Sequence, residues 1–446
     1  MPANPLLSGD ILPLLLRFAW PNMGAMVAAA LAAIAETAYV GSLGAASLAG
    51  MALVFPFVML QVMMSAGAMG GGVSSAVSRA LGAGEQARAN ALAVHAVWIG
   101  LAAGTVYLLL MQTLGATLFV WLGGQGAALA QAVAYAEVAF LGSVFVWLLN
   151  TLASVIRGSG NMSVPSATLF GVALTQAVLA GALGLGWGPF PAWGMRGVAA
   201  GGVLANAFGV LALAGYLLSG RARMTLKLRS TRLQVHLLKD ILRVGAVACI
   251  SPLQTVATIL ILTWLVARFG TEALAGYGIG TRLEFLLVPI AFAVGVASVP
   301  LVGMAVGAGR IARARRAAWM AATLAAVLLS VLGLVVSLVP EVWIHLYTTD
   351  PAIEAAARRY FQWAGPCYGL FGLGLSLYFS SLGAGRATGP VLAGTLRLVL
   401  VAAGGLLLVH WQAPVWMIFA LVALGMAAFG LSTALAVHYT RWGTPR

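Results

Sequence analysis

The sequence has very little charge for its length. Asp, Glu, Lys and Arg together make up 8% of the 446 residues, which is about a third of the share typical of soluble domains. Hydrophobic residues make up 62%. A chain with so few charges cannot hydrate its surface, so we expect lipid to be its solvent. Spanning α-helices satisfy their own backbone hydrogen bonds in lipid, and the composition predicts an all-α integral membrane protein.

Other scarce residues exclude several kinds of site. The only cysteines are Cys249 and Cys367, too few for a disulfide framework, a CxxC motif or a metal cluster. No HExxH motif, nucleophile elbow or Walker loop is present. We therefore expect no catalytic residue, no metal site, no cofactor and no enzyme. Without a nucleotide site, any pumping must be driven by an ion gradient. A membrane-embedded enzyme would need a polar cluster, and a scaffold would need large loops; neither is visible.

Hydrophobic runs of roughly 20 residues, the length that crosses a bilayer, predict twelve transmembrane helices. The chain is expected to form two six-helix pseudo-symmetric lobes, at residues 1–218 and 240–446, joined by a cytoplasmic linker at 219–239. The expected spans are 11–38, 46–78, 90–118, 131–156, 163–186, 194–218, 240–267, 273–306, 317–339, 356–381, 388–409 and 414–438.

The second half of the chain repeats the first. Tyr135 recurs as Tyr360 and Pro165 as Pro390, each 225 residues later. The same offset relates three groups of glycines: 82 and 84 to 307 and 309, 158 to 383, and 160 to 385. Composition alone hardly explains matches in Gly, Pro and Tyr together. Parallel homologous membrane halves are typical of transporters that rock one half against the other.

The net charge of +14 could suggest a nucleic-acid partner, but its distribution does not. Lys and Arg gather in alternate loops, whereas the loops near 41–46, 121–130, 187–195 and 408–415 have none. This is the positive-inside pattern, which predicts that both termini are cytoplasmic. The basic run 221–243 is then a topology signal that also attracts anionic lipid headgroups, and no nucleic-acid partner is expected.

Three of the ten acidic residues fall inside predicted spans: Glu36, Glu137 and Glu284. A carboxyl group within the membrane is a functional hypothesis by default. Removal from water favours its neutral form, which lets it exchange protons near neutral pH. Glu36 has no basic residue within a helical turn or two, so we favour a proton carrier over a carboxylate that reaches water at the span end. Glu137 fits an outer vestibule and the cavity wall equally well.

The second half has its own polar candidates. Arg282 and Glu284 are two residues apart and so do not face each other on a helix. Arg397, in the eleventh predicted span, is a candidate partner for Glu284. We favour a structural ion pair there, with a functional role as the alternative.

Four stretches occur in order along the chain: residues 36–41 (ETAYVG), residues 157–161 (RGSGN) followed by Pro165, residues 188–200 (GPFPAWGMRGVAA), and residues 282–284 (RLE) with Pro289. Taken together, they are similar to the multidrug and toxic compound extrusion (MATE) transporters, in the prokaryotic DinF-like branch. The resemblance covers nearly the whole chain. It implies two six-helix lobes around a central cavity in a bacterial or archaeal plasma membrane, and export of organic cations or other amphiphiles in exchange for protons or sodium.

The resemblance also implies a role for Glu36, since the branch has a first-span aspartate that binds the coupling proton. Two departures from the family's sequence pattern bear on which ion drives transport. Gln176 and Ala180 stand where many members have Asn and Asp, and Leu260 stands at another common acidic position. The acids of the family's second-lobe sodium site are not evident. We therefore expect a proton gradient, rather than sodium, to drive transport through Glu36.

The expected partners are a small amphiphilic or cationic substrate and membrane lipids, and the protein is expected to be a monomer. Tyr39, Tyr135 and Trp147 are candidates for aromatic walls that hold a lipophilic cation, and Asn150 and Gln176 for hydrogen bonds to it. The alternative function is a flippase or exporter of a lipid-linked or other specific amphiphile. Such proteins usually have a strongly cationic cavity, whereas only Arg282 and Arg397 are expected deep in this one.

Overall fold

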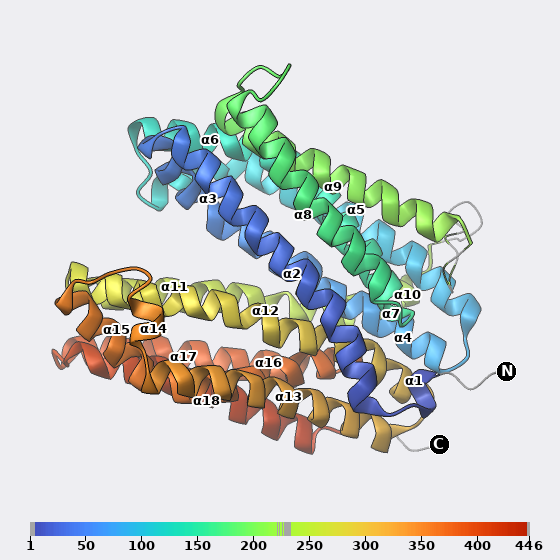
Figure 1. The fold of residues 1–446 in the computed structure, drawn as a ribbon. Coiled ribbons are helices and arrows are strands. Elements are labelled where there is room, and N and C mark those ends of the chain that lie inside the picture. The colour runs from blue at the N-terminus through green and yellow to red at the C-terminus, as the bar shows by residue number, and fades with distance from the viewer. Residues whose placement is uncertain (1–4, 221, 223, 225, 227–232, 444–446) are drawn as a thin grey trace. The chain divides into compact units, whose positions relative to one another are not determined.

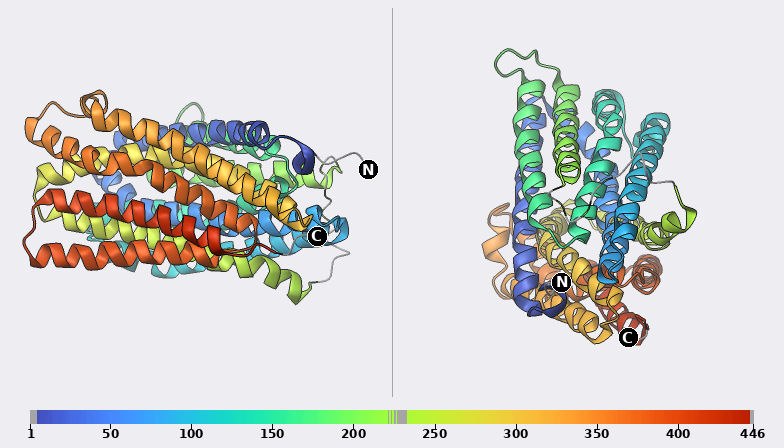
Figure 2. Two further views of the ribbon diagram at one scale, coloured as in Figure 1. Left: turned by 90° about the horizontal axis from the view of Figure 1, so that it is seen from below. Right: turned by 90° about the vertical axis from the view of Figure 1, so that its right-hand side faces the viewer.

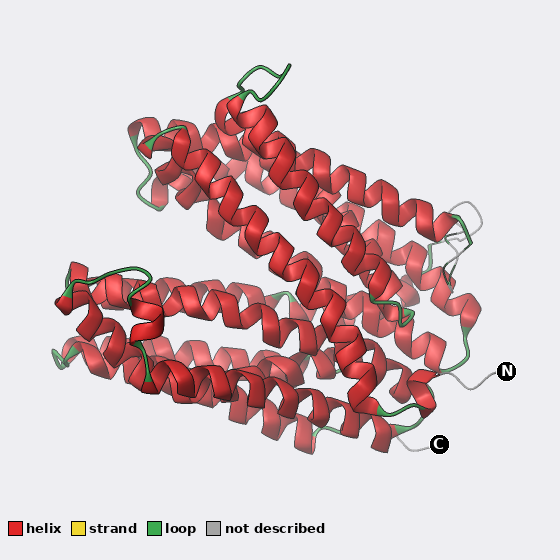
Figure 3. Cartoon of the chain, in the orientation of Figure 1, coloured by secondary structure: helices red, strands yellow, loops and turns green. Residues whose placement is uncertain are grey.

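The computed structural model describes residues 5–220, 222, 224, 226 and 233–443, and these residues form helices and loops with no strand (Figure 3). Much of the predicted linker at 219–239 lies outside the described residues. The prediction of an all-α membrane fold is confirmed. The first half contains α1 (Pro5–Ser8), α2 (Ile11–Ser42), α3 (Ala45–Val62), the π-helical η1 (Met63–Met69), α4 (Gly70–Gly82), α5 (Gln86–Trp121), α6 (Gly126–Leu141), α7 (Ser143–Gly158), α8 (Ser163–Leu185) and α9 (Gly194–Leu218).

The second half has the same order of long helices, labelled with the first in Figure 1. Its elements are α10 (Val235–Ala248), α11 (Ile250–Ala267), α12 (Thr271–Gly307), α13 (Ile311–Leu338), the short α14 (Glu341–Ile344), α15 (Pro351–Ala364), the 3₁₀ turn η2 (Gly365–Cys367), α16 (Tyr368–Gly383), α17 (Thr388–His410) and α18 (Val415–Tyr439).

Contacts divide the chain into two compact units. The N-terminal unit consists of residues 20–246, and the C-terminal unit consists of residues 1–19 together with 247–446. The chain therefore passes between units within α2 and within α10. Each unit thus includes the beginning of a span whose remainder belongs to the other unit.

Ten spans in the described part of the chain are long and apolar enough to cross a membrane. An eleventh consists of α6 and α7, which meet at an angle of 46°. In the second half, α15 and α16, joined by η2, occupy the corresponding place. The offset of 225 residues places α6 and α7 on α15 and α16, and Gly142, between the first two, on Cys367 in η2. The α-helix of the fourth span is thus interrupted at the same point in both halves.

Repeated glycines mark matching turns in the two halves. Gly84 has φ +80° and Gly309 has φ +72°, each directly after a long helix ends. Gly160 and Gly385 match in the same way, with φ +85° and +75°. Because a side chain makes positive φ unfavourable, these turns explain why glycine is present at both copies.

Small residues allow close packing in the N-terminal unit. Helices α8 and α9, drawn green, lie side by side in Figures 1 and 2. A Cβ atom at Gly201 would lie 2.4 Å from the backbone nitrogen of Ala180, and one at Gly197 would lie 2.1 Å from the carbonyl oxygen of Leu183. Glycine is therefore required at both positions, as is typical of close helix pairs in membranes.

Aromatic side chains fill the core of the C-terminal unit. Tyr360, Phe361 and Tyr368 are almost fully buried, and they come from α15 and the start of α16. The Tyr360 ring makes edge-to-face contacts with Tyr277 on α12 and Phe419 on α18, at centroid distances of 5.5 and 5.4 Å. This packing places the Tyr360 side chain inside the core of the C-terminal unit.

Candidate functional site

Glu36 lies in the last third of α2 and is only 5% exposed. Tyr135 on α6 donates its hydroxyl hydrogen to Oε1 of Glu36 at 2.7 Å, and Gln176 on α8 donates from Nε2 to Oε2 at 3.0 Å. Both carboxylate oxygens therefore accept a hydrogen bond. No ion pair joins Glu36 to any cation that the structure describes. The structure thus brings together three of the residues that the sequence analysis selected.

The hydrogen-bond directions suit an ionised carboxylate, because both neighbouring groups donate and neither brings a charge. A protonated Glu36 would itself need an acceptor. Gln176 can supply one by turning its side-chain amide, which exchanges Nε2 for Oε1. Protonation of Glu36 and rearrangement of the contact between α2 and α8 are therefore linked.

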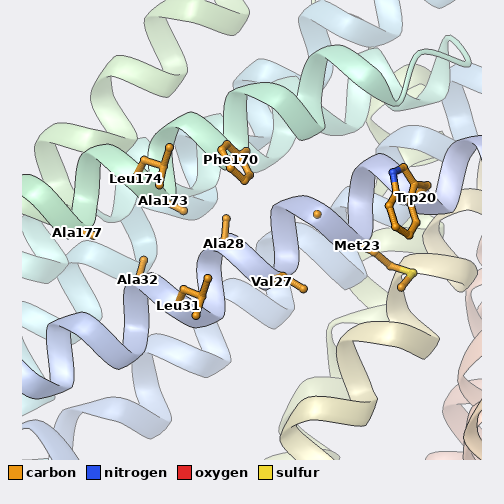
Figure 4. A pocket seen from close by; sticks show the side chains of 11 residues that line it. Trp20, Met23, Val27, Ala28, Leu31, Ala32, Phe170, Ala173, Leu174 and Ala177 are labelled. Carbon is orange, nitrogen blue, oxygen red and sulfur yellow. The ribbon is translucent and has the colours of Figure 1, made fainter.

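An apolar cavity of about 460 Å³ lies along the same pair of helices (Figure 4). Its floor is formed by the nearly buried Ala28, Ala32 and Ala173. Its rim carries large exposed side chains, including Trp20 and Phe170. Glu36 is one helical turn beyond Ala32, and Gln176 is next to Ala177, so the cavity and the Glu36–Gln176 hydrogen bond follow one another along α2 and α8. The complete lining is Trp20, Met23, Gly24, Val27, Ala28, Leu31, Ala32, Phe170, Ala173, Leu174 and Ala177.

The sequence analysis did not select these cavity residues. A signal was present: small residues recur every four positions in the first span, at Gly24, Ala28 and Ala32. Such spacing leaves room along one helix face, but it is equally typical of close helix packing. Only the structure, which shows the facing residues of α8, reveals that a cavity remains between the two helices.

The other aromatic and amide candidates of this unit bond elsewhere. The Tyr39 ring meets Trp187 edge to face at 5.3 Å. Trp147 is 3% exposed, and its Nε1 atom has no hydrogen-bond partner among the described residues. Asn150 donates to Oγ of Ser65 at 2.9 Å, inside the π-helical segment η1. Their proposed contact with a substrate stays a prediction.

Glu137 is a surface residue. Its carboxylate pairs with Arg196 at 3.0 Å, and both side chains are about half exposed or more, at 48% and 62%. This places Glu137 outside the hydrogen-bonded group around Glu36. Among the two positions that the sequence left open, the structure favours the outer one.

The C-terminal unit has a second carboxyl group. Tyr360 donates its hydroxyl hydrogen to Oε1 of Glu284 on α12. Arg397 on α17 acts electrostatically on Glu284, but these two described residues form no ion pair. The expected direct pairing is therefore wrong, because the guanidinium lies over the Phe371 ring instead, 5.4 Å from its centroid.

Arg282 is not deep in the protein. Its side chain is exposed, and its guanidinium carbon lies 4.9 Å from the centroid of the Tyr347 ring. Arg282 is thus more exposed than Arg397, which is partly buried on α17, and its place in a cavity stays a prediction.

Charged and polar contacts fix the start of α10 within the N-terminal unit. Asp240 pairs with Arg79 at 3.0 Å and with Arg88 at 2.8 Å. Nε2 of the fully buried His95 accepts a hydrogen bond from the backbone N–H of Gln234 at 2.7 Å. His95 is therefore a hydrogen-bonded structural residue that positions the helix start.

Comparison with known proteins identifies the family. The MatE family profile matches residues 21–181 and 248–407, and the chain belongs to this family of multidrug and toxic compound extrusion transporters. It is a multi-pass membrane protein. A Deinococcus radiodurans relative named "Probable multidrug resistance protein NorM" is 33% identical over 336 residues, which cover 71% of this chain and 69% of the relative.

Two further relatives match more of the chain at lower identity. A Thermotoga maritima protein, also "Probable multidrug resistance protein NorM", is 27% identical over 387 residues, covering 85% of this chain and 80% of its own. A Shewanella oneidensis protein named "FAD transporter" is 25% identical over 406 residues, covering 89% and 87%.

Solved structures show the same fold. A transporter of the MOP superfamily from Pyrococcus furiosus aligns with a TM-score of 0.89 at 23% identity, covering 97% of this chain and 96% of its own. An outward-facing MATE transporter aligns with a TM-score of 0.87 at 23% identity, covering 98% and 97%. The twelve-helix architecture is thus confirmed.

Proposed function

We propose that this protein is a secondary active antiporter that exports organic cations or amphiphilic drugs in exchange for protons. Its family and its relatives named as multidrug resistance proteins support an export role. The observation that carries the proposal is the isolated carboxylate of Glu36, held by two neutral donors beside an apolar cavity.

The cavity suits an amphiphilic cation. Its lining offers hydrocarbon and two aromatic rings, and the carboxylate one turn beyond it offers a negative charge. A lipophilic cation needs both kinds of contact, because its charge must be balanced when it leaves water. No cationic side chain lines the cavity, so an anionic lipid-linked sugar would find no matching charge there.

The surroundings of Glu36 favour a proton over sodium. Sodium, a hard cation, needs several oxygen ligands, as calcium and magnesium do. Glu36 has no second acid among its bonded neighbours, and Ala180 occupies a position where many relatives have an aspartate. No cluster of three or more His, Cys, Asp or Glu residues that could hold a metal ion is found in the described part of the chain.

The coupling follows from competition for one carboxylate. Ionised Glu36 attracts a cationic substrate into the cavity, and a proton that binds Glu36 from outside removes that attraction. Proton and substrate then favour different global states, which linkage requires for exchange. The proposed setting is a bacterial or archaeal plasma membrane with both termini cytoplasmic, and the proposed active form is a monomer that contacts lipid directly.

The test uses inverted membrane vesicles with an imposed pH gradient and ethidium as the fluorescent cation. Wild type should take up ethidium when the gradient is present, and Glu36→Gln should lose this uptake at equal expression. Glu137→Gln is the matched control, since it neutralises a surface carboxylate of the same unit, and it should remain active.

Two results would overturn the proposal. Uptake by Glu36→Gln at the wild-type rate would place the coupling group elsewhere. Uptake driven by a sodium gradient but not by a pH gradient would replace the proton with sodium.

A further inference from the structure

Arg397 has hydrogen-bond donors that nothing in the described structure uses. It lies near the middle of α17, on the helix face that also carries the buried Pro390, Val401 and Gly405. Its guanidinium contacts the Phe371 ring but makes no hydrogen bond and no ion pair with the residues described. A guanidinium has five N–H donors in a planar fork. A charged side chain at this depth in a membrane is costly, and such residues mark functional sites.

The neighbour that balances its charge does not occupy the fork. Glu284 interacts with Arg397 electrostatically, while its oxygen Oε1 accepts the hydroxyl hydrogen of Tyr360. Glu284 and Arg397 are thus close enough to interact electrostatically but form no hydrogen bond or ion pair with each other. The fork is left free to bind another group.

We propose that Arg397 binds an oxyanion, a carboxylate or phosphate group, inside the C-terminal unit. The planar fork matches either group with two parallel hydrogen bonds. The source is either a solute or a lipid headgroup. The position of Arg397 favours a solute, because headgroups lie roughly 15 Å from the bilayer centre. This site goes beyond the proposed exchange of cations at Glu36, which lies in the other unit.

Glu284 controls the charge of this site. The groups that act on it are Tyr277 of α12, Tyr360 of α15, Tyr368 of α16 and Arg397 of α17. The three phenols are neutral, so the local charge is set by the acid and the arginine. With Glu284 ionised the site is neutral overall, and with Glu284 protonated it is positive. The anion and a proton therefore bind together, and binding strengthens as the pH falls.

The test measures binding of 1-pyrenebutyrate to the whole protein in phosphatidylcholine nanodiscs, by fluorescence, at mildly acidic and mildly alkaline pH. The methyl ester of the probe has the same ring and chain without the charge. Wild type should bind the acid at least about tenfold more tightly than the ester at acidic pH, as expected for a charged hydrogen-bonded pair. The preference should shrink at alkaline pH.

Four variants sharpen the result. Arg397→Gln should bind acid and ester equally, and Arg397→Lys should keep part of the preference, since it keeps the charge without the fork. Glu284→Gln should prefer the acid at both pH values. Glu36→Gln should bind as wild type, which separates this site from the proposed cation exchange. Thermal unfolding in the nanodisc verifies that each variant is folded.

The alternatives have distinct outcomes. If Arg397→Gln is folded and still prefers the acid, or if wild type shows no preference, the site does not exist. If phosphatidylglycerol added to the nanodiscs displaces the probe, the bound oxyanion is the lipid phosphate. If it does not, the oxyanion belongs to a solute.

Discussion

The two units hold a tyrosine at the same repeat position, and each tyrosine binds a different acid. Tyr135 donates a hydrogen bond to Glu36, which lies in the first span of its half. Tyr360, 225 residues later, donates to Glu284, which lies in the second span of its half. The helix that supplies the hydroxyl is therefore repeated, and the helix that supplies the carboxylate is not. The two halves thus have the same order of helices but different arrangements of charged residues.

The difference lies in what a proton does at each acid. Glu36 has only neutral partners, so its protonation takes the local charge from negative to neutral. Glu284 lies near Arg397, so its protonation takes the local charge from neutral to positive. Under the two proposals, the first arrangement releases a cation when a proton binds, and the second attracts an anion. Comparing equivalent substitutions in the two units tests whether this contrast is real.

Removal of the matched hydroxyls should give the largest contrast. In Tyr135→Phe, ionised Glu36 loses a hydrogen bond of the charged kind, commonly about 1.5–3 kcal/mol. We expect ethidium uptake driven by the pH gradient to fall about tenfold, and the pH midpoint of uptake to move upward. Tyr360→Phe should change ethidium uptake much less, although it will lower stability because the lost hydroxyl is buried.

The measurement is initial uptake against pH in inverted vesicles, normalised to the amount of folded protein. Equal losses in both variants would mean that the two units take the same part in cation transport. The contrast between them would then be structural only.

Filling the cavity should have an intermediate effect. Ala28→Leu adds three carbon atoms to a floor position between α2 and α8 (Figure 4). We expect a several-fold rise in the ethidium concentration for half-maximal uptake, since small changes in apolar pocket volume cost about 1–3 kcal/mol. Val27→Leu, at an exposed rim position, is the control. A half-maximal concentration unchanged in Ala28→Leu would show that ethidium binds elsewhere.

The smallest expected effect concerns the ion pairs at the start of α15. The hydrogen bond from Arg358 holds the pKa of Glu354 below its ordinary value of 4.5, with a smaller contribution from His345. Ionised Glu354 therefore stabilises the folded protein at neutral pH. This stability is lost as the pH falls below the ordinary pKa of the carboxyl group and through its lowered pKa in the folded protein. Glu354→Gln should remove this acid-side loss and change Tm at neutral pH by no more than about 2 °C, since the pair is partly exposed.

The measurement is the Tm of the variant from pH 7 downwards, compared with that of wild type at each pH. A Tm curve for Glu354→Gln that falls in acid as steeply as that of wild type would assign the loss to other carboxylates.

Much of the fold was predictable because lipid imposes a simple rule on composition. A helix in hydrocarbon must be long and apolar, so its ends appear in the sequence as the first polar residues or as a glycine turn. The predicted spans at 163–186 and 194–218 differ from α8 and α9 by at most one residue. The bend in the fourth span was not predicted, because the chain stays apolar through Gly142 and hydropathy does not register a change of direction.

The candidate site was predictable in part. Glu36 was found because an acid in a span is rare, and Gln176 because it replaces a residue common in similar proteins. Their mutual hydrogen bond depends on how α2 and α8 are turned, which one sequence does not specify. The same limit applies to Arg397, which the sequence paired with Glu284 and the structure places over Phe371. Residues that are correctly selected can still have different partners.

The matched tyrosines suggest how such a protein changes during evolution. After a duplication both copies inherit the hydroxyl, and either copy can then acquire an acid on any helix that faces it. Since each acid has its own partners, a mutation that alters one leaves the other intact. With both proposed sites in place, the duplicated gene carries two independently adjustable ion sites, and its descendants can exchange one driving ion or cargo charge for another without a new fold.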